Sequence, residues 1–286
     1  MFKWYGLIGI LMILLVHLSF FFKFAPVSLF YFPIVWYGYI LLIDSIIYKL
    51  RRKSLIANHF YSFLGMVFVS QLLWWIFEFI NLFGNKNWNY VGLHSQIASP
   101  YFHSATVRAL YGLISFSTVI PAFFETVELF KTLHLFKNIH LKKHHKISKR
   151  LLFLMAIVGI VFLFSVFLFP KICYPFVWLG FFFILDPINY LHHQPSVIRH
   201  IKEGNFRSLL LLFFAGICVG FLWEFWNYLS PFIKWKYSVP YVGFLKIFEM
   251  PILGYLGYLP FALEMYAFYW FVRSLFYHKE HLLENL

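Results

Sequence analysis

Acidic residues within apolar stretches are the first feature of this sequence that could do chemistry. Six of the 11 acidic residues lie there: Asp44, Glu78, Glu125, Asp186, Glu224 and Glu264. An ionised carboxylate at the centre of a bilayer costs about 2.5–3.5 kcal/mol on insertion scales. We therefore expect these acids to be neutral, paired or hydrated, and a neutral carboxylic acid can act as a proton donor.

Polar and aromatic side chains accompany the acids at helical spacing. On a helix, Glu224 shares one face with Asn227 and Tyr228, and Glu78 has a comparable position beside Trp75. Most of the acids thus have a potential local partner. The pattern favours a shared polar interior in which several carboxyl groups surround one cavity.

Two prolines stand one turn before two of the acids. Pro121 precedes Glu125 by four residues, and Pro260 precedes Glu264 by the same interval. A proline within a helix frees a backbone carbonyl and can bend the helix. We expect the bends to face a cavity.

The elements that carry these residues are transmembrane helices. The chain has 286 residues, of which 62% are hydrophobic, 24% are aromatic and 12% are charged, so it lacks the polar surface of a soluble domain. Apolar runs of about 20 residues, each long enough to cross a bilayer, recur along its length. The predicted fold is an all-α polytopic bundle of about eight spans, at 5–22, 28–48, 58–83, 105–130, 151–170, 173–191, 207–230 and 251–276.

The basic residues predict the orientation of this bundle. With the N terminus inside, 17 of the 24 Lys and Arg residues fall on the cytoplasmic side. Positive residues gather in cytoplasmic loops, so both termini are expected in the cytoplasm and the protein in the cytoplasmic membrane. The net charge of +13 is thereby explained by topology, without a nucleic-acid partner.

The two halves of the chain carry similar residues in the same order. Tyr31-Phe32-Pro33-Ile34-Val35-Trp36 resembles Cys173-Tyr174-Pro175-Phe176-Val177-Trp178, and the match continues through the acids and prolines to Glu125 and Glu264. We expect two four-helix repeats, at 1–130 and 151–286, joined by a basic connector at 131–150. Because four spans is an even number, the repeats should be parallel.

Three further features are assigned conventional roles. The aromatic residues of loops 84–104 and 231–250 favour an interfacial belt, with a lid beside Glu249 as the alternative. The histidines His140, His144 and His145 favour a solvated basic loop over a metal centre. Cys173 and Cys218 form neither a disulfide framework nor a metal motif, so no metal or cofactor is expected.

The order of the motifs resembles the integral-membrane lycopene cyclase and carotenoid hydratase group. That order is Pro and Trp, a membrane Asp, a loop with Trp and Tyr, and then Pro before an intramembrane Glu, covering Tyr31–Glu125 and Cys173–Glu264. The cyclases carry paired glutamates after the proline, whereas Pro121 and Pro260 are each followed by a single Glu four residues later. The resemblance implies a cofactor-independent lyase or isomerase of carotenoid biosynthesis.

The resemblance also implies roles for the residues of the second half. Glu224 and Glu264 would donate protons to an isoprenoid double bond and Asp186 would act as the base, with Asn227 beside them. Aromatic faces would stabilise the carbocation. The proposed wall comprises Trp223, Trp226, Tyr228 and Tyr258, with Glu78 and Glu125 contributing to substrate binding from the first half.

Three other interpretations remain open at this point. The acids could be interhelical hydrogen-bonding groups, worth about 0.6 kcal/mol per bond. Repeats and protonatable residues at membrane depth also fit a proton-coupled transporter or channel for a small solute or lipid. The third alternative is a non-catalytic membrane subunit or scaffold.

Overall fold

The computed structural model describes residues 1–22, 24–84, 86–98, 100–139, 143, 146–239 and 241–276, and it is mostly helical. Six helical segments are long and apolar enough to cross a membrane, so the chain is a polytopic membrane protein. They are α1 (Trp4–Phe21), α3 (Tyr31–Arg51), α5 (Phe60–Phe83), the segment Ala105–Thr132, α8 (Lys149–Leu168) and α12 (Phe206–Leu229).

The other two expected spans differ from this group. The helix α10 (Phe176–Leu191) is apolar but has only 16 residues. The segment expected at 251–276 divides into a 3-10 helix, η1 (Ile252–Gly257), and α13 (Tyr258–Phe276). Within the described residues, six spans rather than eight meet the criteria of length and composition.

The two prolines that precede Glu125 and Glu264 lie in the first turn of a helix and do not bend one. The segment Ala105–Thr132 divides into α6 (Ala105–Phe116) and α7 (Val119–Thr132), and Pro121 is the third residue of α7. Pro260 is likewise the third residue of α13. The first turn of a helix tolerates proline because its N–H groups have no intrahelical partner there. The expected mid-helix bends are therefore corrected to helix starts.

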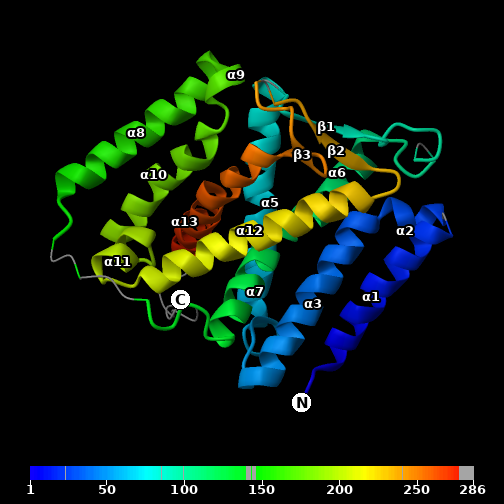
Figure 1. Cartoon of the computed structure of the whole chain (residues 1–286), viewed down its shortest axis with the longest axis horizontal. Helices are drawn as coiled ribbons and strands as arrows, with labels where there is room; N and C mark the ends of the chain where they lie inside the picture. Colours follow the sequence, from blue (N-terminus) through cyan, green and yellow to red (C-terminus); the bar gives the residue numbers. More distant parts are fainter. Residues whose placement is uncertain are drawn as a thin grey trace.

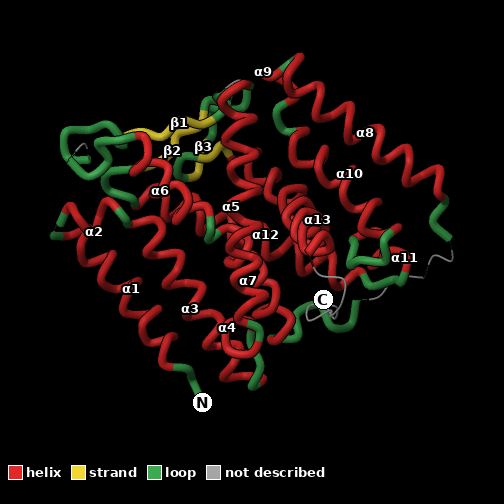
Figure 2. Tube along the Cα trace, turned by 180° about the vertical axis from the view of Figure 1, so that it is seen from behind, coloured by secondary structure: helices red, strands yellow, loops and turns green. Residues whose placement is uncertain are grey.

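Two outer helix pairs flank a central group of four helices. In Figure 1 the pair α1 and α3 lies on one side and the pair α8 and α10 on the other, with α5, α7, α12 and α13 between them. Figure 2 shows the same arrangement from behind. The outer helices α1 and α8 expose many apolar side chains, such as Leu11 and Phe164, which suits contact with lipid.

Glycines permit the close approach of helices within each outer pair. A Cβ atom at Gly9 of α1 would lie 2.5 Å from the carbonyl oxygen of Gly38 in α3. A Cβ atom at Gly159 of α8 would lie 2.7 Å from the carbonyl oxygen of Gly180 in α10. Any side chain at these positions would push the helices apart, so small residues set the interhelical distance.

Short strands join the two halves at the end of the bundle opposite the N terminus (Figure 1). The strands β1 (Trp88–Val91) and β2 (Lys234–Tyr237) pair antiparallel, with Trp88 opposite Tyr237 and Tyr90 opposite Trp235. A second small pair joins β3 (Lys246–Ile247) to β4 (Met250–Pro251). The all-α expectation is thus corrected to a mostly helical fold with two small sheets.

Short helices complete the connections between the longer elements. The helices α2 (Ala25–Leu29) and α9 (Pro170–Cys173) precede α3 and α10, whereas α4 (Leu55–Asn58) and α11 (Val197–Lys202) follow them. Both α4 and α11 begin after a serine in extended conformation, Ser54 or Ser196. Residues 140–142, 144 and 145 of the basic segment 131–150 lie outside the described residues. They include His140, His144 and His145, the three histidines expected to form a basic loop.

Candidate functional site

Glu78 lies near the C-terminal end of α5, where three donors converge on one of its carboxyl oxygens. Oε1 accepts hydrogen bonds from Tyr90 Oη at 2.6 Å, Trp88 Nε1 at 3.0 Å and Trp74 Nε1 at 3.2 Å. Among the described residues none donates to Oε2, and the side chain of Glu78 is only partly buried. Oε2 therefore remains available as a hydrogen-bonding or proton-transferring atom.

Glu224 lies at the equivalent place near the end of α12 and is completely buried. Its Oε1 accepts hydrogen bonds from Tyr237 Oη and Tyr258 Oη, both at 2.7 Å. Trp235 Nε1 donates to Tyr237 Oη at 2.8 Å. Oε2 of Glu224 has no hydrogen-bond partner within the described part of the chain.

Gly220 makes room for one of these tyrosines. It lies one helical turn before Glu224 on α12, and a Cβ atom built there would come within 2.4 Å of the Tyr258 ring. The glycine therefore lets the ring of Tyr258 lie flat against α12 with its hydroxyl group on the glutamate.

Two asparagines fix the strands that supply the donors. Asn81 Nδ2 donates to the carbonyl oxygen of Trp88 at 3.0 Å, and its Oδ1 accepts from the Trp88 N–H at 3.4 Å. Asn227 makes the same two contacts with Trp235, both at 2.9 Å. Each amide thus acts as a backbone clamp, one turn after the glutamate on the same helix. Asn227, expected beside the catalytic acids, lies one turn from Glu224 and contacts the backbone of β2.

The phenols remain donors because their surroundings oppose ionisation. Burial and the neighbouring Glu78 carboxylate raise the pKa of Tyr90 well above its usual value. Burial and Glu224 do the same for the pKa of Tyr237. Both hydroxyl groups therefore keep their protons near neutral pH and hold the carboxyl oxygens through O–H···O contacts.

A cavity of about 760 Å³ lies next to both glutamates. It is enclosed by parts of α5, α6, α10, α12, the strands β1 and β2, and the start of α13. Most of its lining is apolar and aromatic, including Trp74, Trp178, Trp223, Tyr258 and Phe261. A volume in this range accommodates a small-molecule ligand.

Three of the residues expected at the site line this cavity. They are Glu78, Trp223 and Tyr258. Glu224 does not line it, but Tyr237 and Tyr258, which donate to Glu224, do. Glu224 therefore reaches the cavity only through two phenol groups.

The aromatic rings of the cavity pack against one another rather than toward lipid. The rings of Trp74 and Trp223 stack with centroids 5.3 Å apart, and Trp178 meets Phe261 edge-on at 5.0 Å. Trp74 belongs to the first half of the chain and Trp223 to the second. Both halves thus contribute to one aromatic wall, whose stacked rings hold its shape.

The other expected site residues lie away from the lining. Trp226 packs against Trp36 with ring centroids 4.6 Å apart, and Tyr228 is 52% exposed; neither is among the residues that line the cavity. Glu264 and Glu125 are buried in α13 and α7, and neither has a hydrogen-bond partner for its carboxyl oxygens among the described residues. The acids thus do not gather around one cavity.

Asp186 and Asp44 hold the starts of short helices. Asp186 accepts hydrogen bonds from the backbone N–H groups of Val197 at 2.8 Å and Ile198 at 2.9 Å, at the start of α11. Asp44 accepts from the Ile56 N–H at 2.8 Å at the start of α4, and also from the hydroxyl groups of Tyr5 and Ser54. Carboxylates at helix N termini satisfy otherwise unpaired N–H groups, which gives Asp186 a structural contact here.

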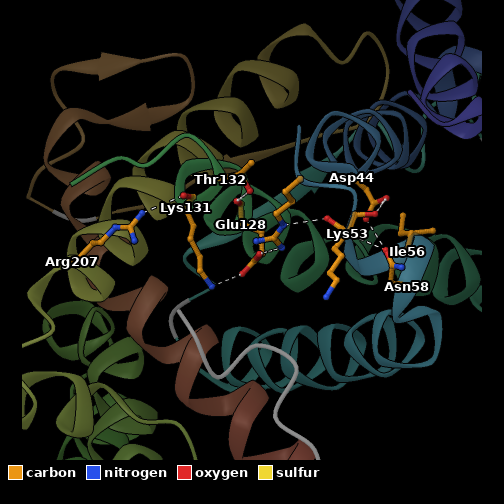
Figure 3. A network of polar contacts seen from close by, with 10 residues as sticks. Asp44, Lys53, Ile56, Asn58, Glu128, Lys131, Thr132 and Arg207 are labelled. Carbon is orange, nitrogen blue, oxygen red and sulfur yellow. Dashed lines mark hydrogen bonds and ion pairs between the residues drawn. The ribbon is translucent and has the colours of Figure 1, made fainter. Parts of the chain in front are cut away.

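A polar network extends from the neighbourhood of Asp44 to Arg207 (Figure 3). Glu128 forms ion pairs with Arg51 and with Lys131, whose Nζ lies 3.5 Å from Oε1. Arg207 in turn donates to the carbonyl oxygen of Lys131 at 3.2 Å. Glu125, next to Asp44, interacts with its carboxyl group electrostatically. Asp44, Glu125 and Glu128 therefore lie in one group, separate from Glu78 and Glu224 beside the cavity.

Comparison with protein-family models, curated proteins and solved structures found no match to this chain. Within the described residues no three His, Cys, Asp or Glu side chains lie close enough to hold a metal ion. The site is consequently defined by its own geometry: a glutamate facing an aromatic cavity and a second glutamate behind the cavity's tyrosines.

The sequence pattern missed the donors of this site. Trp88, Tyr90, Trp235 and Tyr237 were expected to form an interfacial belt, but Trp88, Tyr90 and Tyr237 point to the glutamates and Trp235 points to Tyr237. The partner of Glu78 on its own helix is Trp74 rather than Trp75. The signal that could have found the donors was their recurrence in both halves, Trp-x-Tyr at the same distance after Asn81 and Asn227 to within one residue.

Proposed function

We propose that this protein is a membrane enzyme that binds a lipid or isoprenoid in the aromatic cavity and acts on it by carboxyl acid–base chemistry. The observation that carries the proposal is the asymmetry of Glu78: three donors reach Oε1 and none of the described residues reaches Oε2. A carboxylic acid held in this way presents its proton-bearing oxygen to the cavity. Mostly apolar walls suit a hydrocarbon substrate.

The chemistry requires no redox change. Glu78 Oε2–H transfers its proton to one carbon of a double bond, and the π electrons form the new C–H bond and leave a cation on the other carbon. Loss of a proton from an adjacent carbon to Oε2 then forms a new double bond and restores the acid. The net reaction is an isomerisation, or a cyclisation if a second double bond attacks the cation first.

The cavity wall supplies the stabilisation that a carbocation needs. The aromatic rings that line the cavity can offer negative quadrupole density to a cation, and the apolar walls exclude water that would capture it. Glu224 orients Tyr237 and Tyr258 and is a positioning residue rather than the acid. This assignment moves the principal role from Glu224 and Glu264 to Glu78.

Internal duplication accounts for the arrangement of the site. We infer that α1, α3, α4 and α5 correspond to α8, α10, α11 and α12. Asn81 and Asn227 each clamp a tryptophan of their own strand. Trp88 of β1 corresponds to Trp235 of β2, and Tyr90 corresponds to Tyr237. When each residue is replaced by its counterpart, the pair Trp88–Tyr237 becomes the pair Trp235–Tyr90, which is also present in the sheet. A two-fold axis between Asn89 and Lys236 would explain this register.

The orientation and the family relationship are part of the same proposal. The excess of basic residues near the Asp44 group supports a cytoplasmic location for that end, with the cavity near the opposite face. Kinship with the lycopene cyclase and carotenoid hydratase group rests on the motif order alone. The protonation chemistry suits that group, and the duplicated helical units suit it as well.

The test compares the lipids of membranes that contain the protein with those that contain Glu78→Gln. The amide retains the shape of the side chain but cannot transfer a proton, so we expect the lipid product to disappear and its precursor to accumulate, as measured by mass spectrometry of extracted membranes. Glu203→Gln, at an exposed position, is the control and should leave the product unchanged. Identical lipid profiles for the wild type and Glu78→Gln would rule the mechanism out.

A proton-coupled transporter is the second candidate, because the acids are distributed over both ends of the bundle. Glu125 is buried beside Asp44 near one end, whereas Glu78 and Glu224 lie near the other. Carboxyl groups at successive depths are what a proton pathway uses. Proton-driven uptake into proteoliposomes that is lost in Glu125→Gln would favour this class over the enzyme.

A further inference from the structure

The charged residues of the cavity are mostly basic. Among its described lining residues, Arg108, Lys171 and Lys234 are cationic, and Glu78 is the acidic one. A smaller hollow shares Lys171, Tyr237, Val239 and Tyr241 with the cavity and adds Lys246. Positive charge therefore exceeds negative charge among the residues that line the apolar cavity.

These cations have no carboxylate partner within the described part of the chain, where the two ion pairs both involve Glu128. Arg108 uses one nitrogen to donate to the carbonyl oxygen of Phe102 at 2.8 Å. Lys234 donates to the carbonyl oxygen of Tyr228 at 2.9 Å. Several donors of the guanidinium and ammonium groups thus remain for a ligand.

Lys234 lines the cavity, but its ammonium group contacts Tyr228, a residue outside the lining. Burial lowers the pKa of Lys234, and the Glu249 carboxylate opposes this effect from a distance too great for an ion pair. Its ammonium group also lies over the ring of Tyr228, 5.5 Å from the centroid. Lys171, in contrast, is exposed on α9 and lines both hollows. Arg and Lys side chains are the groups that proteins use to bind phosphate and other anions.

We propose that the cavity binds an amphiphile with an anionic headgroup, which Arg108, Lys171 and Lys234 hold while the apolar chain enters between the aromatic rings. The shared chemistry of the headgroup is that of a phosphate or phosphate ester, whose oxygens accept several charge-assisted hydrogen bonds. The inference rests on the proposed function because it names the substrate class of the same cavity. A neutral hydrocarbon would leave the three cations without a counterion.

The experiment measures lipid binding to the purified full-length protein in nanodiscs. The host lipid is phosphatidylcholine, and the probes are phosphatidic acid and diacylglycerol with brominated chains of equal length, which quench tryptophan fluorescence in the cavity. We expect quenching by the anionic probe at a lower concentration than by the neutral one. Replacement of Arg108, Lys171 and Lys234 by Gln should lower the affinity for the anionic probe by about fivefold for each cation removed.

The control variant is Lys236→Gln, which removes an exposed charge of β2 that does not line the cavity. This variant should leave the preference for the anionic over the neutral probe unchanged. Inorganic phosphate, added as a competitor, separates the two sources of the anion: displacement of the brominated lipid at millimolar phosphate would assign the cations to a water-soluble ligand and overturn the proposal. Equal binding of both probes by the wild type, or an unchanged preference in the triple variant, would overturn it as well.

This result is distinguishable from the test of the enzyme. Glu78→Gln keeps the three cations, so it should retain the preference for the anionic probe even though it forms no product. If the protein prefers the anionic probe but Glu78→Gln does not change the lipid profile, the proposed chemistry is refuted and the binding site is retained. If product formation depends on Glu78 but the protein does not prefer the anionic probe, the binding site is refuted and the chemistry is retained.

Discussion

Trp88 of β1 and Tyr237 of β2 lie opposite each other in the sheet, and their side chains hold different glutamates. Trp88 Nε1 donates to Glu78 at 3.0 Å, and Tyr237 Oη donates to Glu224 at 2.7 Å. The strand pair therefore couples the two acids mechanically. A change that loosens either strand should affect the hydrogen bonds of both glutamates.

The backbone clamp formed by Asn227 can be tested by its contribution to stability. Asn227→Ala removes two hydrogen bonds from the backbone of Trp235 in a buried place. We expect the free energy of unfolding to fall by about 1–3 kcal/mol, because a buried N–H and a carbonyl lose their partners. Thermal unfolding in detergent measures the change. Asn89→Ala, an exposed residue of β1, is the control, and an equal loss of stability in both variants would contradict the clamp.

Gly220 should be intolerant of any side chain. In Gly220→Ala the new Cβ atom would meet the ring of Tyr258 at 2.4 Å, so the ring must move away from Glu224. We expect a loss of about 1–3 kcal/mol from overpacking, together with reduced product formation. Gly65→Ala on α5 is the matched control, since no atom lies within 4 Å of its Cβ position. Equal melting temperatures for the two variants would show that Tyr258 is not packed in this way.

Asp186 should matter for folding more than for chemistry. In Asp186→Leu the N–H groups of Val197 and Ile198 lose their acceptors, and we expect a loss of about 1–3 kcal/mol in the free energy of unfolding. Asp186→Asn should lose less, because its amide oxygen still accepts one hydrogen bond. Both are measured by thermal unfolding in detergent. If Asp186→Asn melted like the wild type but formed no product, Asp186 would act as the base after all.

His200 predicts a pH dependence of stability. It lies in α11 outside the spanning helices, and burial followed by the charge of Arg199 lowers its pKa from 6.5 to about 4. Its Nε2 is 2.8 Å from Tyr266 Oη. Below about pH 6.5 the histidine of the unfolded chain binds a proton, whereas His200 in the folded chain does not. The contribution of His200 to the free energy of unfolding is therefore complete above pH 6.5, and it should decline by about 3 kcal/mol as the pH falls toward 4.

Melting temperatures of the protein in detergent between pH 7.5 and 4 measure this contribution. The Asp186 carboxyl and the Arg199 guanidinium also lie near Tyr266, so the wild-type curve alone does not isolate the histidine. His200→Gln keeps a polar partner for the tyrosine but does not titrate, and it should flatten the curve between pH 6.5 and 4. An unchanged slope in this variant would assign the dependence to the carboxyl groups.

Part of the site was predictable because it depends on local composition. Glu78 and Glu224 stand out in the sequence as acids within apolar helices, and the structure brings both to one aromatic cavity or its wall. The partners were not predictable from helical spacing. Tyr90 follows Glu78 by 12 residues and Tyr258 follows Glu224 by 34. Such contacts depend on how a loop or a distant helix folds back, which spacing within one helix does not encode.

The sequence by itself determined that this chain enters a membrane, because apolar runs of helical length leave no alternative solvent for its surface. It also predicted that Asp44, Glu125, Asp186, Glu224 and Glu264 lie within apolar surroundings, and the structure buries all five. Only the tertiary structure decided which acid faces a cavity, since Asp186 and Glu78 occur in similar apolar surroundings along the chain. The physical reason is that the backbone N–H groups of α11 satisfy Asp186, whereas the donors from β1 and α5 leave Oε2 of Glu78 available.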